Sequence, residues 1–253
     1  NDVVYSGADL EPVDSKSRAW KLKEGVVDSS PLSDTPRPGN AKFKKLTPVD
    51  PNSTNPYQLT EADRTVIGNT TPKFSGGFGL NATYKGFDMS MFFNFMYDFD
   101  VLNANKIMLT TWADNKENNF LMNIASDKRW RNFDDMGNEI RYSPEVLAEF
   151  NKNATMWNPT SIGRPICMSY AVEDGSFLRL NSATLGYTLP SVWTKKVGLS
   201  KVRFYVSGNN LFTLTGYSGY DPEVNIATGL TPNIDYNRYP RSRTYTFGAQ
   251  LTF

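Results

Sequence analysis

The side chains that most often perform chemistry are scarce in this sequence of 253 residues. It contains no histidine and a single cysteine, Cys167. These counts exclude histidine-based catalytic triads, histidine-ligated metal sites, an internal disulfide and multi-cysteine metal sites. One pair of carboxylates stands out, Asp221 and Glu223 around Pro222. Such a segment indicates a turn rather than two facing carboxyl groups with separated pKa values, so we predict no catalytic residue.

Aromatic residues offer a second kind of chemistry, because their faces stack on sugars and pack into protein interfaces. They make up 13% of the chain, and five of them lie in segments that have no strand pattern. These candidate contact residues are Trp112, Trp130, Trp157, Tyr217 and Tyr220. The alternative for each is packing of the loops on themselves.

Net charge and hydropathy exclude further classes of protein. The formal charge is +1, from 27 Lys and Arg against 26 Asp and Glu, so no basic field would attract nucleic acid or an anionic membrane surface. Mean hydropathy is −0.47, and no stretch approaches 18 continuous apolar residues, which excludes a transmembrane helix. Polar and apolar residues alternate along the strands of a membrane β-barrel, so their hydropathies cancel in the mean. Mean hydropathy therefore does not exclude a membrane β-barrel.

Period-2 alternation is the main structural signal. It predicts strands over 73–84, 87–99, 176–188, 201–214 and 244–253, with a tight turn at Lys85-Gly86. A change of phase in the third strand predicts a β-bulge near Asn181. Pro144 and Glu145 predict a short helix over 143–151, and a weaker pattern allows a strand around 20–27.

The strands divide the chain into alternating long and short connections. We expect a mostly extracellular loop over 1–72, a barrel hairpin over 73–100 and a long extracellular loop over 101–175. A second hairpin follows over 176–214, then an extracellular loop over 215–240 and a final strand over 241–253. Strands of this length and loops of this asymmetry are typical of outer-membrane barrels.

The fold class is therefore predicted as all-β, a transmembrane antiparallel β-barrel with long extracellular loops. A soluble β-sandwich explains the alternation equally well, but it explains the strand length and the loop asymmetry less well. Single-chain bacterial barrels have even strand numbers from eight upward, so five strands would be only part of one. A start at Asn1, without methionine, also suggests a processed product or a fragment.

Four runs of residues resemble the SusC/RagA class of TonB-dependent outer-membrane transporters. They are ADRTVIGNTTPKFSGGFGLNATYKGFDMSMFF (62–93), VEDGSFLRLNSATLGYTLP (172–190), KVRFYVSGNNLFTLTGYSGYDPEV (201–224) and YPRSRTYTFGAQLTF (239–253). The runs are similar to the C-terminal barrel segment of that family in order and spacing, up to a terminal phenylalanine.

The resemblance implies a plugged barrel of about 22 strands in the outer membrane of a Gram-negative, Bacteroidetes-like bacterium. It further implies import of oligosaccharides or peptides, energised through TonB, with a SusD-like surface lipoprotein as partner. The partners expected are thus this lipoprotein, TonB through an upstream part, the substrate and outer-membrane lipid. Nucleic acid is not among them. The loop aromatics would then contact either the substrate or the lipoprotein.

Two further sites come from the resemblance. Many family members carry an acidic loop before the DRTVIG motif that looks like a calcium site. Here Asp50, Asn52 and Asp63 remain as oxygen ligands, together with Glu61, but the glycine of the sharp turn and the central aspartate are missing. We therefore expect no cofactor, with an Asx-turn loop as the alternative to calcium. Phe253 resembles the C-terminal aromatic signal read by the outer-membrane assembly machinery.

Two other functions remain open at this point. A soluble β-sandwich could bind carbohydrate through exposed aromatics, as a binding module. A glycoside hydrolase would need a working pair of Asp or Glu residues. Soluble expression of 62–253 as a monomer would favour the first, and loss of activity on changing one carboxylate would favour the second.

Overall fold

The computed structural model describes residues 4–13, 19–33, 35–111, 121, 128–162, 166–223 and 233–253. The chain divides into two compact units. One comprises 1–66 and 105–168, and the other comprises 67–104 and 169–253. Among the described residues, no helix combines the length and the apolar character needed to cross a membrane.

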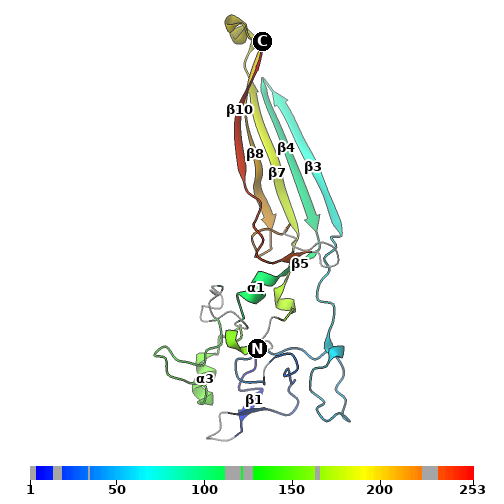
Figure 1. Cartoon of the computed structure of the whole chain (residues 1–253), viewed down its shortest axis with the longest axis vertical. Helices are drawn as coiled ribbons and strands as arrows, with labels where there is room; N and C mark the ends of the chain where they lie inside the picture. The colour runs from blue at the N-terminus through cyan, green and yellow to red at the C-terminus, as the bar shows by residue number, and fades with distance from the viewer. Residues whose placement is uncertain are drawn as a thin grey trace. The chain divides into compact units, whose positions relative to one another are not determined.

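The second unit contains a five-stranded antiparallel sheet, whose strands lie side by side in Figure 1. The strands run in the order β10-β8-β7-β4-β3. Their bounds are β3 Phe74–Tyr84, β4 Phe87–Tyr97, β7 Phe177–Thr188, β8 Lys201–Thr215 and β10 Thr244–Thr252. These are the five strands that the alternation predicts.

Short connections join β3 to β4 and β7 to β8. In the first, Lys85 and Gly86 both have positive φ, of 46° and 90°, which is the geometry of a two-residue hairpin turn. The second contains α4 (Ser191–Thr194) and the single-turn helix η4 (Lys195–Val197). Gly198 ends that turn in the left-handed conformation that glycine adopts without strain.

The predicted β-bulge is present in β7. The pairing with β4 shifts between Leu180 and Ser182, so Asn181 is the extra residue. Strand β8 also contains a bulge, because two of its residues, Asn210 and Leu211, lie opposite the single residue Asn181 of β7. Asn210 has a positive φ of 52° there.

A smaller three-stranded sheet lies in the same unit and is not predicted by the alternation. It has the order β6-β5-β9, with β5 at Asp100–Asn103, β6 at Val172–Asp174 and β9 at Ile234–Asp235. Strand β4 therefore ends at Tyr97, two residues before the predicted end, because the chain turns at Asp98 with a φ of 58°. The helical turn η3 (Ser169–Ala171) precedes β6.

The first unit has little regular structure. It holds the two-stranded sheet of β1 (Leu10–Pro12) and β2 (Trp20–Leu22), and the helical turns η1 (Glu61–Asp63) and η2 (Pro159–Ser161). The predicted helix is α3 (Pro144–Phe150), with Ser143 at its N-cap and Pro144 in its first turn. The short helix α1 (Ala104–Met108) begins where the two units join along the chain.

Candidate functional site

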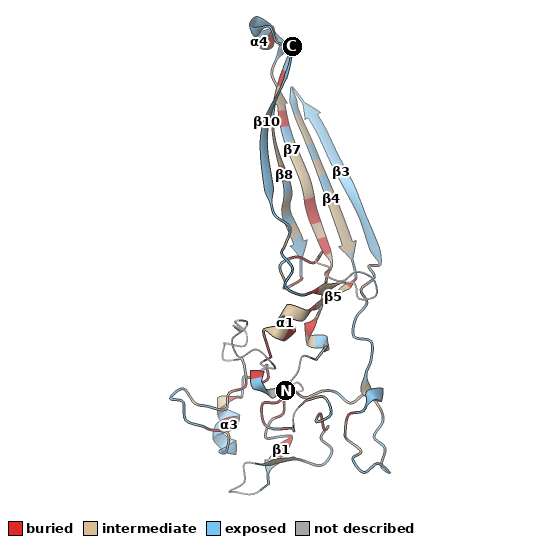
Figure 2. Cartoon of the chain, in the orientation of Figure 1, coloured by how far each residue is buried: buried red, intermediate tan, exposed pale blue. Residues whose placement is uncertain are grey.

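The five-stranded sheet has one continuous apolar face. The cross-strand register places Leu80, Met91, Ala183 and Gly208 in one row across the sheet. Large apolar side chains on this face are exposed. Figure 2 marks most residues of β3 and β10 as exposed. The exposed residues are Phe74, Phe78, Leu80, Tyr84, Phe87, Tyr97, Leu185, Phe204, Phe212, Leu214, Tyr245, Phe247 and Leu251.

Such a surface differs from the core face of a β-sandwich. A sandwich buries its apolar face against a second sheet, but the other sheets of the described residues have only two and three strands. An exposed apolar patch of this extent marks a surface that contacts a membrane or a protein. The geometry therefore favours the membrane wall over the soluble sandwich.

The opposite face of the sheet is polar and carries a cross-strand ion pair. Arg203 of β8 donates from Nε to Asp88 of β4 at 2.9 Å, and its Nη2 contacts the other carboxylate oxygen. The pair reaches across β7 at Gly186. A Cβ at Gly186 would lie 2.6 Å from Asp88 Oδ1 and would also meet the guanidinium, so a larger residue there would push the ends of these two side chains aside.

Two apolar side chains interrupt the polar face, and each has a packing reason. A Cβ at Gly77 would lie 2.8 Å from Phe92 Cζ, so the Phe92 ring covers the glycine of the neighbouring strand. Met96 packs against a buried cluster formed by Phe99, Val101, Phe177 and Tyr217. This cluster anchors the loop that follows β8 onto the polar face of the sheet.

A buried ionic cluster fixes the same loop, and we call it the Arg179 clamp. The Arg179 side chain is only 3% exposed. Its two terminal nitrogens donate hydrogen bonds to the two carboxylate oxygens of Asp221, at 2.5 and 3.2 Å. Arg179 Nε lies 3.0 Å from Glu223 Oε2, and Arg241 Nη2 lies 3.5 Å from Glu223 Oε1. The two carboxylates that sequence places around Pro222 thus share one arginine, which gives them a structural role.

The charges of this clamp shift the pKa of Asp221. Burial alone would raise it, but the hydrogen bonds from Arg179 and from the backbone of Glu223 outweigh burial and lower the pKa below its usual value. Asp221 is therefore a stable anion. A general acid would need the opposite shift, so the clamp does not suit acid catalysis.

Tyr217 forms a second buried contact of the loop. Its hydroxyl donates to Asp235 Oδ2 of β9 at 2.7 Å. Burial, together with the neighbouring Asp235 carboxylate, raises the pKa of Tyr217 well above its usual value. The adjacent Ser218 donates from its backbone N–H and its hydroxyl to Glu173 of β6, at 2.9 and 2.8 Å.

The structure separates the five predicted aromatic contact residues. Trp130, Trp157 and Tyr217 are buried in their own units, and the Trp157 indole donates to the Thr110 carbonyl at 3.2 Å. Tyr220 is 85% exposed, while Trp112 lies outside the described residues. Of the four described, Tyr220 alone presents its ring to solvent, and its contact with a substrate or lipoprotein stays a prediction.

Two of the three predicted calcium ligands, Asp50 and Asp63, already accept hydrogen bonds within the protein. Asp63 accepts hydrogen bonds from the backbone N–H groups of Leu46, Thr47 and Thr60, and Lys45 Nζ lies 3.2 Å away. These bonds lower the pKa of Asp63 although burial opposes the shift. Asp50 accepts from the backbone N–H of Asn52 at 2.9 Å, which is an Asx turn. In the described part of the chain, no group of three or more metal-binding side chains is found, and the expectation that no cofactor is bound stays untested.

Phe253 follows the last strand residue, Thr252, and its side chain is 87% exposed. It continues the alternation of β10, in which Tyr245, Phe247 and Leu251 share the apolar face. Its role as an assembly signal stays a prediction.

The sequence did not predict the ion pairs between a strand and the loop after β8, whose partners lie far apart along the chain. Arg179 shares the polar face with Asn94, its partner in β4. A buried arginine needs a partner for its charge, but the burial of Arg179 is seen only in the structure. The partner itself lies 42 residues along the chain and could not be identified from spacing.

Sequence comparisons find similar proteins among TonB-dependent receptors. The chain is 34% identical over 236 residues to TonB-dependent receptor P3 of Formosa agariphila, a match that covers 91% of this chain and 20% of the relative. It is 38% identical over 88 residues to the TonB-dependent receptor SusC of Bacteroides thetaiotaomicron, which covers 33% of this chain and 8% of SusC. The chain spans about a fifth of the length of the curated relatives that it matches along most of its own length. No protein-family model matches it.

Among solved structures, the chain is similar to the RagAB peptide transporter. The TM-score is 0.59 at 22% identity, and the match covers 99% of this chain and 22% of the RagAB chain. The same transporter in its open-open state gives a TM-score of 0.57. At this identity the likeness concerns the fold.

Proposed function

Because this chain is a segment of the SusC/RagA class of TonB-dependent receptors, we propose that the whole protein imports nutrients across the outer membrane of a Gram-negative bacterium. Oligosaccharides or peptides are the proposed cargo, and the peptide option gains support from the RagAB likeness. The relatives are receptors and transporters rather than enzymes, so no catalytic residue is assigned.

One observation carries this proposal, the two-faced sheet with its exposed apolar side. In hydrocarbon, exposed apolar side chains are stable and every backbone polar group needs a protein partner. Strands β3 and β10 form the two edges of the described sheet, so each has a free edge. In the whole receptor we expect both edges to pair with further strands of the barrel.

The mechanism that we propose involves no bond chemistry. The long connections would receive the cargo at the outer face, together with a SusD-like lipoprotein. The polar face with Asp88 and Arg203 would line the lumen, through which the cargo passes after the plug domain moves. TonB would supply the energy through an upstream part of the protein.

Uptake measurements test the proposed function. We expect deletion of the gene for the full-length protein to abolish uptake of labelled peptides or labelled oligosaccharides that are too large to pass through porins, because such substrates need an active importer. Deletion of tonB should cause the same loss. Unchanged uptake in the tonB strain, or recovery of the protein in the soluble fraction, would contradict the proposal.

Phe253 provides a test of membrane assembly. We expect its deletion to lower the amount of folded protein in the outer membrane several-fold, because the terminal aromatic is the proposed assembly signal. Phe253→Tyr is the matched control, since it keeps an aromatic ring at the same place. Immunoblots of outer-membrane fractions measure both, and normal levels of the deletion variant would count against the signal.

A further inference from the structure

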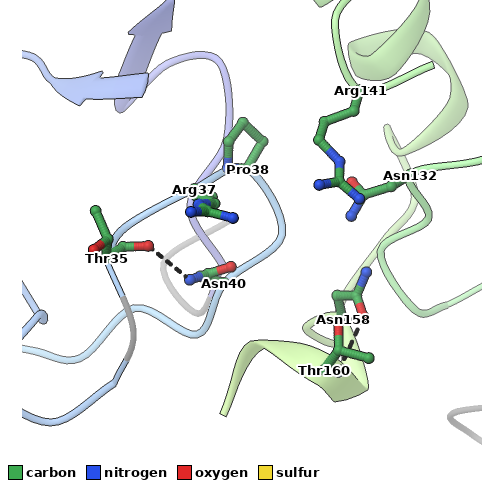
Figure 3. A pocket seen from close by; sticks show the side chains of 8 residues that line it. All are labelled: Thr35, Arg37, Pro38, Asn40, Asn132, Arg141, Asn158 and Thr160. Atoms are coloured by element: carbon green, nitrogen blue, oxygen red, sulfur yellow. Dashed lines mark hydrogen bonds between the residues drawn. The ribbon is translucent and has the colours of Figure 1, made fainter. Parts of the chain in front are cut away.

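The first unit contains a polar cavity of about 260 Å³ that the proposed function does not use. Figure 3 shows its lining, with one wall formed by the loop 35–40 and the other by residues of 132–160. The lining residues are Thr35, Arg37, Pro38, Asn40, Asn132, Arg141, Asn158 and Thr160. Of these described residues, two are arginines and none is acidic.

The two arginines lie on opposite walls. Arg37 belongs to the loop that forms one wall, and the terminal nitrogens of Arg141 lie beside Asn132 on the other wall (Figure 3). Within the described residues, no ion pair involves Arg37. Arg141 pairs with Glu139 through Nε at 3.3 Å, which leaves its terminal nitrogens as donors.

Asn158 adds a third donor to the cavity. Its side-chain oxygen accepts from the backbone N–H and the hydroxyl of Thr160, at 3.1 and 2.9 Å. Its amide nitrogen therefore points away from Thr160 and into the cavity, as Figure 3 shows. Two guanidinium groups and an amide N–H₂ thus line the same cavity, and all are hydrogen-bond donors.

The backbone around Gly39 holds the two walls together. Asn158 donates its backbone N–H to the Gly39 carbonyl at 2.8 Å, and Gly39 donates its own to Tyr5 at 2.9 Å. The buried indole of Trp130 packs directly on Gly39, where a Cβ would lie 2.7 Å from Cγ of the ring. The cavity is therefore built before any ligand arrives, and Trp130 supports it without lining it.

From this geometry we infer that the cavity binds a single oxyanionic group, a carboxylate or a sulfate, carried by the cargo. Guanidinium groups form paired, charge-assisted hydrogen bonds with such groups. The cavity is smaller than the clefts of roughly 300–1,000 Å³ that hold drug-sized ligands, so it suits one charged unit of a longer chain. No aromatic residue lines it among the described residues, which argues against stacking on a neutral sugar.

This inference rests on the proposed function and names the chemical class of its cargo as anionic. Binding to the purified full-length protein tests it without transport. The anionic probes are D-glucuronate, glucose 6-sulfate and N-acetyl-L-alanyl-L-glutamic acid α-amide, and the uncharged counterparts are D-glucose and N-acetyl-L-alanyl-L-glutamine amide. We expect at least one anionic probe to bind more tightly than its neutral counterpart, and the probe that binds identifies a sugar or a peptide as the source.

Substitutions of the two cavity arginines test whether the anionic probe binds in this cavity. Arg37→Gln and Arg141→Gln should each weaken this binding about tenfold or more, because each removes a charge-assisted hydrogen bond. Arg64→Gln is the control, since Arg64 is exposed, pairs with Glu61 and does not line the cavity. Equal binding of charged and neutral probes, or unchanged binding by Arg37→Gln, would overturn the inference. TonB-dependent uptake is measured separately, so such a failure would leave the proposed function standing.

Discussion

Replacing Met91 with arginine should strongly destabilise the folded receptor. Met91 lies near the middle of β4 on the apolar face, opposite Leu80 and Ala183. An arginine on the lipid side of a barrel costs about 2–4 kcal/mol at the bilayer midplane. We therefore expect less folded protein in outer membranes and a lower temperature for loss of the heat-modifiable band on gels.

Ser90→Arg is the matched control for this change. Ser90 is the neighbouring residue on the polar face, where it lies opposite Asn81 and Thr184 and is exposed. The same charge placed there would face water and should change stability little. If the two variants lost stability equally, the assignment of the two faces would be wrong.

Replacing Arg179 with methionine should also have a large effect. It would leave the carboxylates of Asp221 and Glu223 buried without their shared cation. Removing one partner of a buried ion pair costs about 3–5 kcal/mol. We expect the loop after β8 to become sensitive to protease in the full-length protein, and the unfolding temperature to fall.

The pH dependence of this variant has a definite sign. In the native clamp the pKa of Asp221 is lowered, so its contribution to stability is present above the usual aspartate pKa and is lost as pH falls through the lowered value. Without Arg179 the largest cause of the lowered pKa is lost while burial remains, so Arg179→Met should lose less stability than the parent protein as the pH falls.

Two further variants control for general damage. Arg64→Met removes an exposed arginine that pairs with Glu61 and should cost at most about 1 kcal/mol. Adding Asp221→Asn and Glu223→Gln to Arg179→Met removes the uncompensated charges and should recover much of the loss. Equal stability of Arg179→Met and Arg64→Met would show that the clamp contributes nothing.

The strands could be predicted from sequence because each depends on local information. Alternation fixes which side chains share a face, Lys85-Gly86 fixes the turn, and the phase change at Asn181 locates the bulge. The small sheet of β5, β6 and β9 escaped prediction, because strands of two to four residues are too short to show a period.

The loop residues were harder to predict because burial there depends on distant partners. Trp157 contacts Thr110, 47 residues away, and Trp130 packs on Gly39. Nothing near these tryptophans in sequence shows that they support the loops from within. The cavity of Arg37 and Arg141 likewise brings together residues more than 90 positions apart, which only the folded chain reveals.

The bulges in β7 and β8 constrain how strand lengths can change during evolution. One extra residue in β7 exchanges the parity of its apolar positions, from Leu178 and Leu180 to Leu185 and Tyr187. Two residues opposite it in β8 leave the parity unchanged, so Val202 and Leu214 still share a face. A single-residue deletion in β8 would move the apolar side chains of half of that strand to the polar face of the sheet, and its polar side chains to the apolar face. Length variation here is therefore expected in coupled steps, with insertions in one strand matched by insertions in its neighbour.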